Sequence, residues 1–166
     1  MATGRSNQLT KQIGEYLVAC ELARRGLIAT TFSGNVPDFD LIVTDFKGSS
    51  CPIQVKTSKN GTWQFSIDKF VEIHFEGQKQ IIGNKKPLHI PHLVCVFVVA
   101  SEKYGDDTFF ILEWAKVQDI LVANHARWLE SCGGVRPKKF DSMHCALYQS
   151  DLEEYKDNWS LITTKL

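Results

Sequence analysis

Two short apolar segments carry polar side chains at regular positions, and this pattern most restricts how the chain can fold. The first segment, residues 37–43, reads Pro-Asp-Phe-Asp-Leu-Ile-Val, and the second, residues 53–57, reads Ile-Gln-Val-Lys-Thr. Successive side chains point to opposite faces of a strand, so Gln54 and Lys56 share one face while their apolar neighbours occupy the other. The two segments therefore predict neighbouring strands of one sheet, with polar groups placed on an apolar surface.

The residues between the two segments predict that these strands pair with each other. Residues 45–50 contain Lys-Gly-Ser-Ser, which is favourable turn chemistry. On the first strand we expect Asp38 and Asp40 to share a face. If the strands pair through this turn, Asp40 comes close to Gln54 and Lys56, and a polar cluster forms on a hydrophobic sheet.

Residues 6–25 predict a well-buried helix, because apolar residues recur at helical spacing on more than one side and Gly26 follows two arginines. Glu15 precedes Val18 and Leu22 by three and seven residues, so it lies on an apolar flank of this helix. A carboxylate in such a position needs a partner or a cation. Two alternatives remain open: an ion pair with a lysine or arginine, or a metal ligand.

The rest of the chain predicts further strands and one long helix. Strands are expected at 27–32, 39–44, 52–57, 62–67, 92–100 and 108–112, and helices at 114–131 and, from capping-box spacing, after 150–153. Residues 68–82 are ambiguous and are predicted to be partly helical, and residues 83–87 form a loop. This order predicts an α/β fold with a central mixed β-sheet flanked by helices. At 166 residues the chain fits a single domain spanning residues 1–166.

The composition argues against several classes of protein. Hydrophobic residues make up 43% and charged residues 23% of the chain, which is ordinary for a soluble α/β protein. Apolar runs stay well below the ~18 residues that a membrane span requires, and the first residues lack the hydrophobic core of a signal peptide. We therefore expect a cytoplasmic protein without a membrane partner. The five widely spaced cysteines predict free thiols.

The formal net charge is zero, which argues against indiscriminate binding of polyanions. The charges are nevertheless unevenly distributed, because residues 79–92 and 136–139 are locally basic. Two interpretations remain open, namely solvated loops and helix faces, or two edges that contact phosphate groups.

The segments that carry these polar groups resemble the PD-(D/E)XK nuclease superfamily, in the branch of Holliday-junction resolvases and small homing or restriction-like endonucleases. The resemblance rests on Gly14-Glu15 in the first helix and on the segments 37–43 and 53–58, and it covers about the first 60 residues. The apolar strand at 93–99 suits the core of that family. The resemblance implies a restriction-endonuclease-like core in the order αβββαβ, and a metal-dependent endonuclease that hydrolyses DNA phosphodiester bonds.

The same resemblance implies roles for individual residues. Glu15, Asp40 and Gln54, together with the carbonyl of Val55, would hold Mg²⁺ or Mn²⁺, because hard oxygen ligands suit these ions. The ion would polarise the scissile phosphate and lower the pKa of a bound water. Lys56 would orient or deprotonate the attacking water and neutralise charge that gathers on the phosphate.

Two positions depart from the family pattern or leave a choice. The family usually has a carboxylate where this chain has Gln54, so one negative charge is missing and metal affinity should be lower. Asp40 is the preferred acid of the first strand because it adjoins the apolar run, which leaves Asp38 as a supporting or turn residue. Thr57 or Ser58 could donate a hydrogen bond to the phosphate, although capping of a turn is the commoner role for such residues.

The implied partner is DNA, either duplex or branched. The candidate DNA contacts are Lys59, Lys85, Lys86, Arg136, Lys138 and Lys139. Cleavage of both strands would require a homodimer or a higher homo-oligomer, an expectation that rests on size alone. Three alternatives remain: a catalytically inactive nuclease-like module that binds nucleic acid or protein, a nuclease that acts on RNA, and a purely structural ion pair between Lys56 and Asp40.

Overall fold

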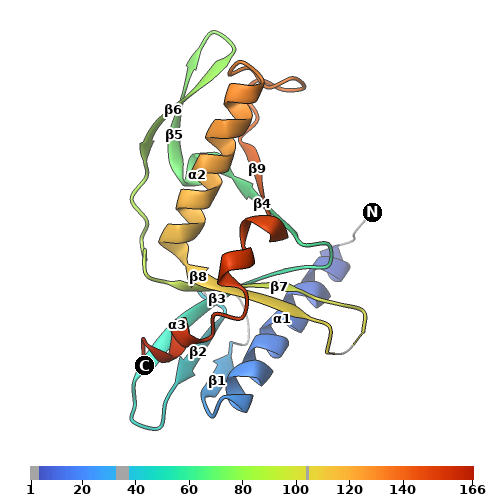
Figure 1. Cartoon of the computed structure of the whole chain (residues 1–166), viewed down its shortest axis with the longest axis vertical. Helices are drawn as coiled ribbons and strands as arrows, with labels where there is room; N and C mark the ends of the chain where they lie inside the picture. The colour runs from blue at the N-terminus through green and yellow to red at the C-terminus, as the bar shows by residue number, and fades with distance from the viewer. Residues whose placement is uncertain (1–3, 33–37, 104) are drawn as a thin grey trace.

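The computed structural model describes residues 4–32, 38–103 and 105–166, and its centre is a five-stranded mixed sheet (Figure 1). In spatial order the strands are β1 (Ile28–Thr31), β2 (Leu41–Thr44), β3 (Ser50–Ser58), β7 (Val94–Val99) and β8 (Thr108–Glu113). Strands β3 and β7 run parallel, and the other neighbouring pairs are antiparallel. The expected pairing of the two polar strands is confirmed, because β2 and β3 pair antiparallel across the predicted turn.

Both faces of this sheet are covered, and the alternation of side chains along β7 separates two apolar clusters. Val94 and Val96 belong to the cluster beneath helix α1 (Gly4–Arg24), whereas Cys95 and Phe97 belong to the cluster beneath helix α2 (Trp114–Ser131). All four side chains are fully buried. The predicted mixed sheet flanked by helices is therefore confirmed, and the second helix has the bounds that the sequence indicated.

Two smaller sheets lie on the α2 side of the molecule. Strand β4 (Thr62–Ser66) pairs antiparallel with β9 (His144–Tyr148). After a short 3₁₀ turn (Ile67–Lys69), strands β5 (Val71–Glu76) and β6 (Lys79–Lys85) form a hairpin that projects beside α2 (Figure 1). The connection between the parallel strands β3 and β7 is thus built from strands.

This connection differs from the expected order αβββαβ, in which a helix follows the third strand. The helical prediction for residues 68–82 is wrong, and the predicted loop at 83–87 is strand as far as Lys85. Glu76 and Lys79 pair across a two-residue turn in which Gly77 has φ +61°. Glycine with positive φ at this position is typical of a tight hairpin turn. The second helix follows β8 instead.

The C-terminal region also differs from the expected short helix after residues 150–153. It contains two 3₁₀ turns (Gln149–Asp151 and Glu153–Tyr155) followed by a four-residue helix, α3 (Ser160–Thr163). The carboxylate of Asp151 accepts a hydrogen bond from the N–H of Tyr148 at 2.8 Å. The predicted cap at Ser150 and Glu153 is therefore replaced by one at Tyr148 and Asp151, which closes a 3₁₀ turn.

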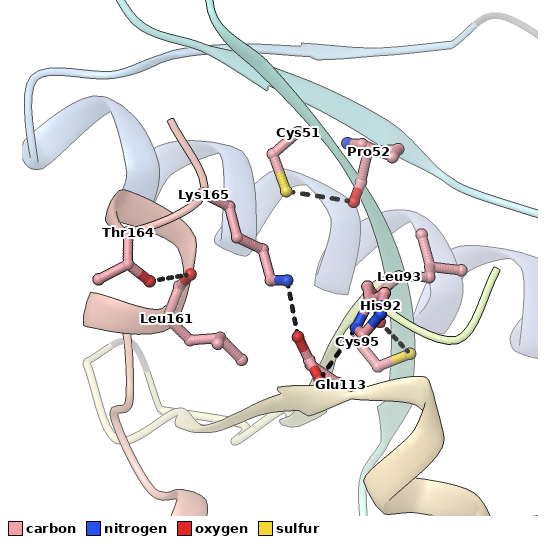
Figure 2. A network of polar contacts seen from close by, with 9 residues as sticks. All are labelled: Cys51, Pro52, His92, Leu93, Cys95, Glu113, Leu161, Thr164 and Lys165. Atoms are coloured by element: carbon pink, nitrogen blue, oxygen red, sulfur yellow. Dashed lines mark hydrogen bonds and ion pairs between the residues drawn. The ribbon is translucent and has the colours of Figure 1, made fainter.

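A salt bridge holds the last residues of the chain against the end of β8 (Figure 2). The Nζ atom of Lys165 lies 2.6 Å from Oε1 of Glu113, and Nδ1 of His92 lies 3.5 Å from Oε2 of the same carboxylate. Lys165 holds the pKa of Glu113 below its ordinary value. Trp159, just before α3, is buried in the apolar cluster beneath α1, so the C-terminal segment completes that side of the core.

Helix α1 (Gly4–Arg24) packs on β3 through a glycine. Its buried residues Gly14, Val18 and Leu22 follow one another at four-residue spacing and form a stripe towards the sheet. A Cβ atom added at Gly14 would lie 1.8 Å from Oγ1 and 2.8 Å from Cβ of Thr57. Only glycine permits this approach, which places the neighbouring Glu15 beside the sheet. No helix in the described ranges is long and apolar enough to cross a membrane.

We expect Gly14→Ala to lower the free energy of unfolding by about 1–3 kcal/mol, the usual cost of overpacking a well-filled interface. Gly4→Ala is the matched control, because it lies on the same helix and an added Cβ would meet nothing within 4 Å. Urea denaturation of the two variants measures the difference. Equal stabilities of the two variants would contradict the close approach of α1 to β3.

A buried polar network holds the β5–β6 hairpin against α2. His125 of α2 is 4% exposed, and its Nε2 atom lies 3.1 Å from Oε1 of Gln80 on β6. The amide nitrogen of Gln80 donates to the carbonyl oxygens of Phe140 at 2.7 Å and Ser142 at 3.0 Å. Burial, assisted by the charge of Arg136, lowers the pKa of His125 to about 4. The imidazole is therefore neutral near pH 7.

This network should make the stability depend on pH between about 6.5 and 4. The imidazole titrates near 6.5 in an unfolded chain, so in this window the unfolded state binds more protons and acidification favours it. Between pH 7 and pH 5 the loss should be about 2 kcal/mol. Urea denaturation at both pH values, compared with His125→Gln, isolates the effect, because the variant cannot titrate. The same pH dependence in both proteins would contradict it.

Candidate active site

Asp40 is fixed beside β3 through both its main chain and its side chain. Its N–H donates to the carbonyl of Ile53 at 2.8 Å, and its Oδ2 atom accepts the N–H of Val55 at 2.8 Å. The second carboxylate oxygen, Oδ1, lies 3.0 Å from Nζ of Lys11. One oxygen of Asp40 therefore has a structural role, and the other is directed to a cation.

Lys11 lies between two carboxylates, and the sequence analysis did not single it out. Its Nζ atom is 3.0 Å from Oδ1 of Asp40 and 3.5 Å from Oε1 of Glu15, which lies one turn further along α1. The contact with Asp40 raises the pKa of Lys11. Burial raises the pKa of Glu15, and Lys11 opposes that shift. The spacing of four residues between Lys11 and Glu15 was the available signal.

Lys56 lies half-buried on β3, close enough to Asp40 for the two charges to interact. Burial lowers the pKa of Lys56, and the negative charge of Asp40 opposes that shift. The carbonyl oxygen of Lys56 accepts a hydrogen bond from Nε1 of Trp63 at 2.9 Å. Trp63 is 4% exposed and belongs to the apolar cluster beneath α2. This indole therefore supports the main chain at Lys56, and its ring is core.

The alternation of side chains along β3 places the other two candidate ligands, Gln54 and Val55, on opposite faces of the sheet. Gln54 is half-buried and lines the same pocket as Lys56, whereas the side chain of Val55 is buried in the cluster beneath α1. Asp40 meets β3 between these two polar residues through the N–H of Val55. The structure therefore brings Glu15 and Asp40 together at Lys11. Lys56 interacts with Asp40 through their charges without a direct ion pair, and Gln54 lines the pocket beside Lys56.

Asp38 has a different environment from Asp40. It is exposed and has φ +72°, a left-handed conformation that non-glycine residues adopt mainly in turns. Strand β2 begins at Leu41, so the strand alternation that we expected to put Asp38 and Asp40 on one face does not extend to Asp38. Pro37, which opens the sequence motif, lies outside the described residues.

Thr57 and Ser58 serve the packing and the turn around the site. The hydroxyl of Thr57 is buried beneath Gly14 and has no hydrogen-bond partner among the described residues. The hydroxyl of Ser58 lies 2.7 Å from Oδ1 of Asn60 and accepts the N–H groups of Asn60 and Thr62 at 3.2 Å. Capping of the β3–β4 turn, the role that we favoured, is therefore what Ser58 performs.

A pocket of about 1040 Å³ opens beside Lys56 and Gln54. It lies between the first turns of α1 and strand β4, and half-buried aromatic rings of Phe65 and Trp114 form part of its wall. Its described lining residues include Lys56, Lys59 and Lys69 but no aspartate or glutamate. Three lysines without an acid among the described lining residues make the pocket locally positive.

The other predicted DNA contacts, Lys85, Lys86, Arg136, Lys138 and Lys139, do not line this pocket. Lys85 forms an ion pair with Asp119 at 2.7 Å, and the guanidinium of Arg136 lies 4.6 Å from the ring of Trp128. The segment between α2 and β9 lies near the projecting β5–β6 hairpin, at the end of the molecule away from α1 (Figure 1). The structure thus separates Lys59 from the basic segment at 136–139.

The metal-ligand set is sparse. Within the described ranges, no three histidine, cysteine, aspartate or glutamate side chains cluster so that they could hold a metal ion. The predicted set instead combines the carboxylates of Glu15 and Asp40 with the amide of Gln54. Lys11 serves as a stand-in cation, because its ammonium contacts an oxygen of each carboxylate. The two acids therefore share one ammonium cation.

Comparison with known proteins identifies the fold. No family model and no curated protein matches the chain. Among solved structures it is similar to a bacterial homing endonuclease, I-Ssp6803I, with a TM-score of 0.53 and 14% identity over 96% of this chain and 95% of that one. It is also similar to Hjc, a Holliday junction resolvase from the archaeal hyperthermophile Archaeoglobus fulgidus, with a TM-score of 0.46 and 11% identity over 92% and 95% of the two chains. The first likeness shows that the chain has the fold of a nuclease.

Two replacements of Asp40 should distinguish the contribution of its main-chain hydrogen bond from that of its negative charge. Asp40→Ala leaves the N–H of Val55 without its acceptor and should cost about 1–3 kcal/mol of unfolding free energy. Asp40→Asn keeps an oxygen that can accept this hydrogen bond, and loss of the partly exposed ion pair with Lys11 should cost only about 0–1 kcal/mol. Urea denaturation compares them, and equal losses would contradict the structural role of Oδ2.

Proposed function

We propose that this chain is a metal-dependent endonuclease of the PD-(D/E)XK type that hydrolyses DNA phosphodiester bonds. The observation that carries the proposal is the convergence of Asp40 and Glu15 on one ammonium group, with Lys56 close enough to interact with Asp40. The nuclease fold supports the same conclusion. Neither an acid pair nor a half-buried lysine would carry the proposal alone, because structural ion pairs also occur on sheets.

The proposed ligands of Mg²⁺ or Mn²⁺ are Glu15, Asp40 and Gln54 with the carbonyl of Val55. Carboxylate and amide oxygens are the hard ligands that these ions prefer. Asp40 offers Oδ1, since Oδ2 is already bonded to the N–H of Val55. When bound, such an ion supplies polarisation of the phosphate and a water of lowered pKa. Because Gln54 stands where the family usually has a carboxylate, this site carries one negative charge fewer than the usual site of that family.

Lys56 is the proposed catalytic amine. Its burial lowers its pKa, so the amine gives up its proton more readily than an exposed lysine. It can therefore accept a proton from an attacking water when neutral, or stabilise negative charge on the phosphate when protonated. The hydrogen bond from Trp63 to the carbonyl of Lys56 fixes the main chain from which the amine extends.

The pocket beside Lys56 is the proposed binding surface for the DNA backbone. Its lysines, Lys59 and Lys69 as well as Lys56, are not accompanied by an acid among the described lining residues. Positive grooves attract the phosphate backbone whatever its sequence. A single site cuts one strand, so cleavage of both strands would require a second copy of the chain.

The competing function is a catalytically inactive module that binds nucleic acid or protein. Two observations favour it, namely Gln54 in the place of a carboxylate and the ammonium of Lys11 between the two acids. In that alternative Lys11 replaces the metal permanently. The two functions differ in whether a divalent ion can displace Lys11 from the two acids.

Cleavage of supercoiled plasmid and of branched DNA with Mg²⁺ or Mn²⁺ tests the proposal. The wild-type protein should nick or cut at least one of these substrates. Asp40→Asn removes a proposed metal ligand and Lys56→Met removes the proposed proton-transfer group, so each should lower the rate by about 100-fold or more. Lys47→Ala is the matched control, because Lys47 is an exposed lysine in the β2–β3 turn and should leave the rate unchanged.

Circular dichroism should first show that each variant is folded. Absence of cutting by wild type on every DNA substrate with either metal would overturn the endonuclease proposal in favour of the inactive module. Cutting of RNA alone under the same conditions would keep the site but replace the substrate.

A further inference from the structure

The ammonium of Lys11 lies where the proposed metal ion would have to bind. It contacts Oδ1 of Asp40 at 3.0 Å and Oε1 of Glu15 at 3.5 Å. Oδ1 is the oxygen of Asp40 that the main chain of β3 does not use, because Oδ2 accepts the N–H of Val55. A lysine and a divalent ion would therefore compete for the same two oxygens.

The surroundings of Lys11 allow it to withdraw. Its side chain is 52% exposed, whereas those of Glu15 and Asp40 are 15% and 11% exposed. A half-exposed ion pair contributes little stability, because water and salt screen it and the long lysine side chain loses freedom when it is held. The two acids are fixed by the helix and the strand, and the lysine is the component of this cluster that is free to move into solvent.

We propose that Lys11 is an internal competitor of the metal, a positioning residue that neutralises Glu15 and Asp40 in the metal-free protein and is displaced when Mg²⁺ or Mn²⁺ binds. This inference rests on the proposed metal site. It explains how two carboxylates that repel each other remain together beside an apolar sheet when no metal ion is bound. It also makes occupancy of the site depend on the concentration of the divalent ion.

Titration calorimetry with Mn²⁺ and the folded full chain tests this competition directly, without an activity measurement. Lys11→Met removes the charge but keeps an aliphatic stem of similar length, and it should bind Mn²⁺ about three- to tenfold more tightly than wild type, because two weak ion pairs no longer have to be broken. Lys116→Ala is the matched control: it removes an exposed lysine from α2 and should leave the affinity unchanged. Asp40→Asn in the Lys11→Met background should abolish the binding.

Thermal unfolding supplies a second readout. Without metal, Lys11→Met should melt below wild type, because two carboxylates then repel each other, and saturating Mn²⁺ should raise its melting temperature more than that of wild type. Equal Mn²⁺ affinities in wild type and Lys11→Met would overturn the role of Lys11, and wild-type cleavage of DNA with Mn²⁺ would in that case leave the endonuclease proposal standing. Absence of Mn²⁺ binding in both proteins would overturn both proposals.

Discussion

The close packing of helix α1 on strand β3 is the constraint on which the rest of the site depends. Gly14 has no side chain, so the helix can lie directly on Thr57, whose Oγ1 an added Cβ would overlap at 1.8 Å. Glu15 follows Gly14 and therefore lies beside the sheet close to Asp40, the residue just before β2. A side chain at position 14 would lift the helix and separate the two acids. The glycine thus links core packing to the chemistry of the site.

Electrostatics explains why this cluster is exceptional on an apolar sheet. Burial disfavours the charged form of Glu15 and of Lys56, and each is offset by an opposite charge nearby. Asp40 is central, because it accepts a main-chain hydrogen bond, pairs with Lys11 and interacts with Lys56. Such an arrangement costs stability unless every charge is matched. The matching of these charges is the basis of the metal site that we propose.

The sequence allowed the strand pair and the long helix at 114–131 to be predicted, because each depends on periodicity and turn chemistry within a short segment. It did not allow the β5–β6 hairpin to be predicted, because tertiary contacts such as that of Gln80 with His125 select strand over helix there. Lys11 was missed for a related reason. Its spacing to Glu15 was visible, but its contact with Asp40 spans the fold. The roles of Glu15, Asp40, Gln54, the Val55 carbonyl and Lys56 in a metal site all stay predictions.

A crystal soaked in Mn²⁺ and measured for anomalous scattering tests the central claim most directly, since it asks whether one divalent ion occupies the space between the two acids. Our account predicts an anomalous peak bonded to Oδ1 of Asp40 and to the carboxylate of Glu15, with the Lys11 side chain displaced into solvent. An unchanged Lys11 ammonium between the two carboxylates, with no peak beside them at saturating Mn²⁺, would contradict it.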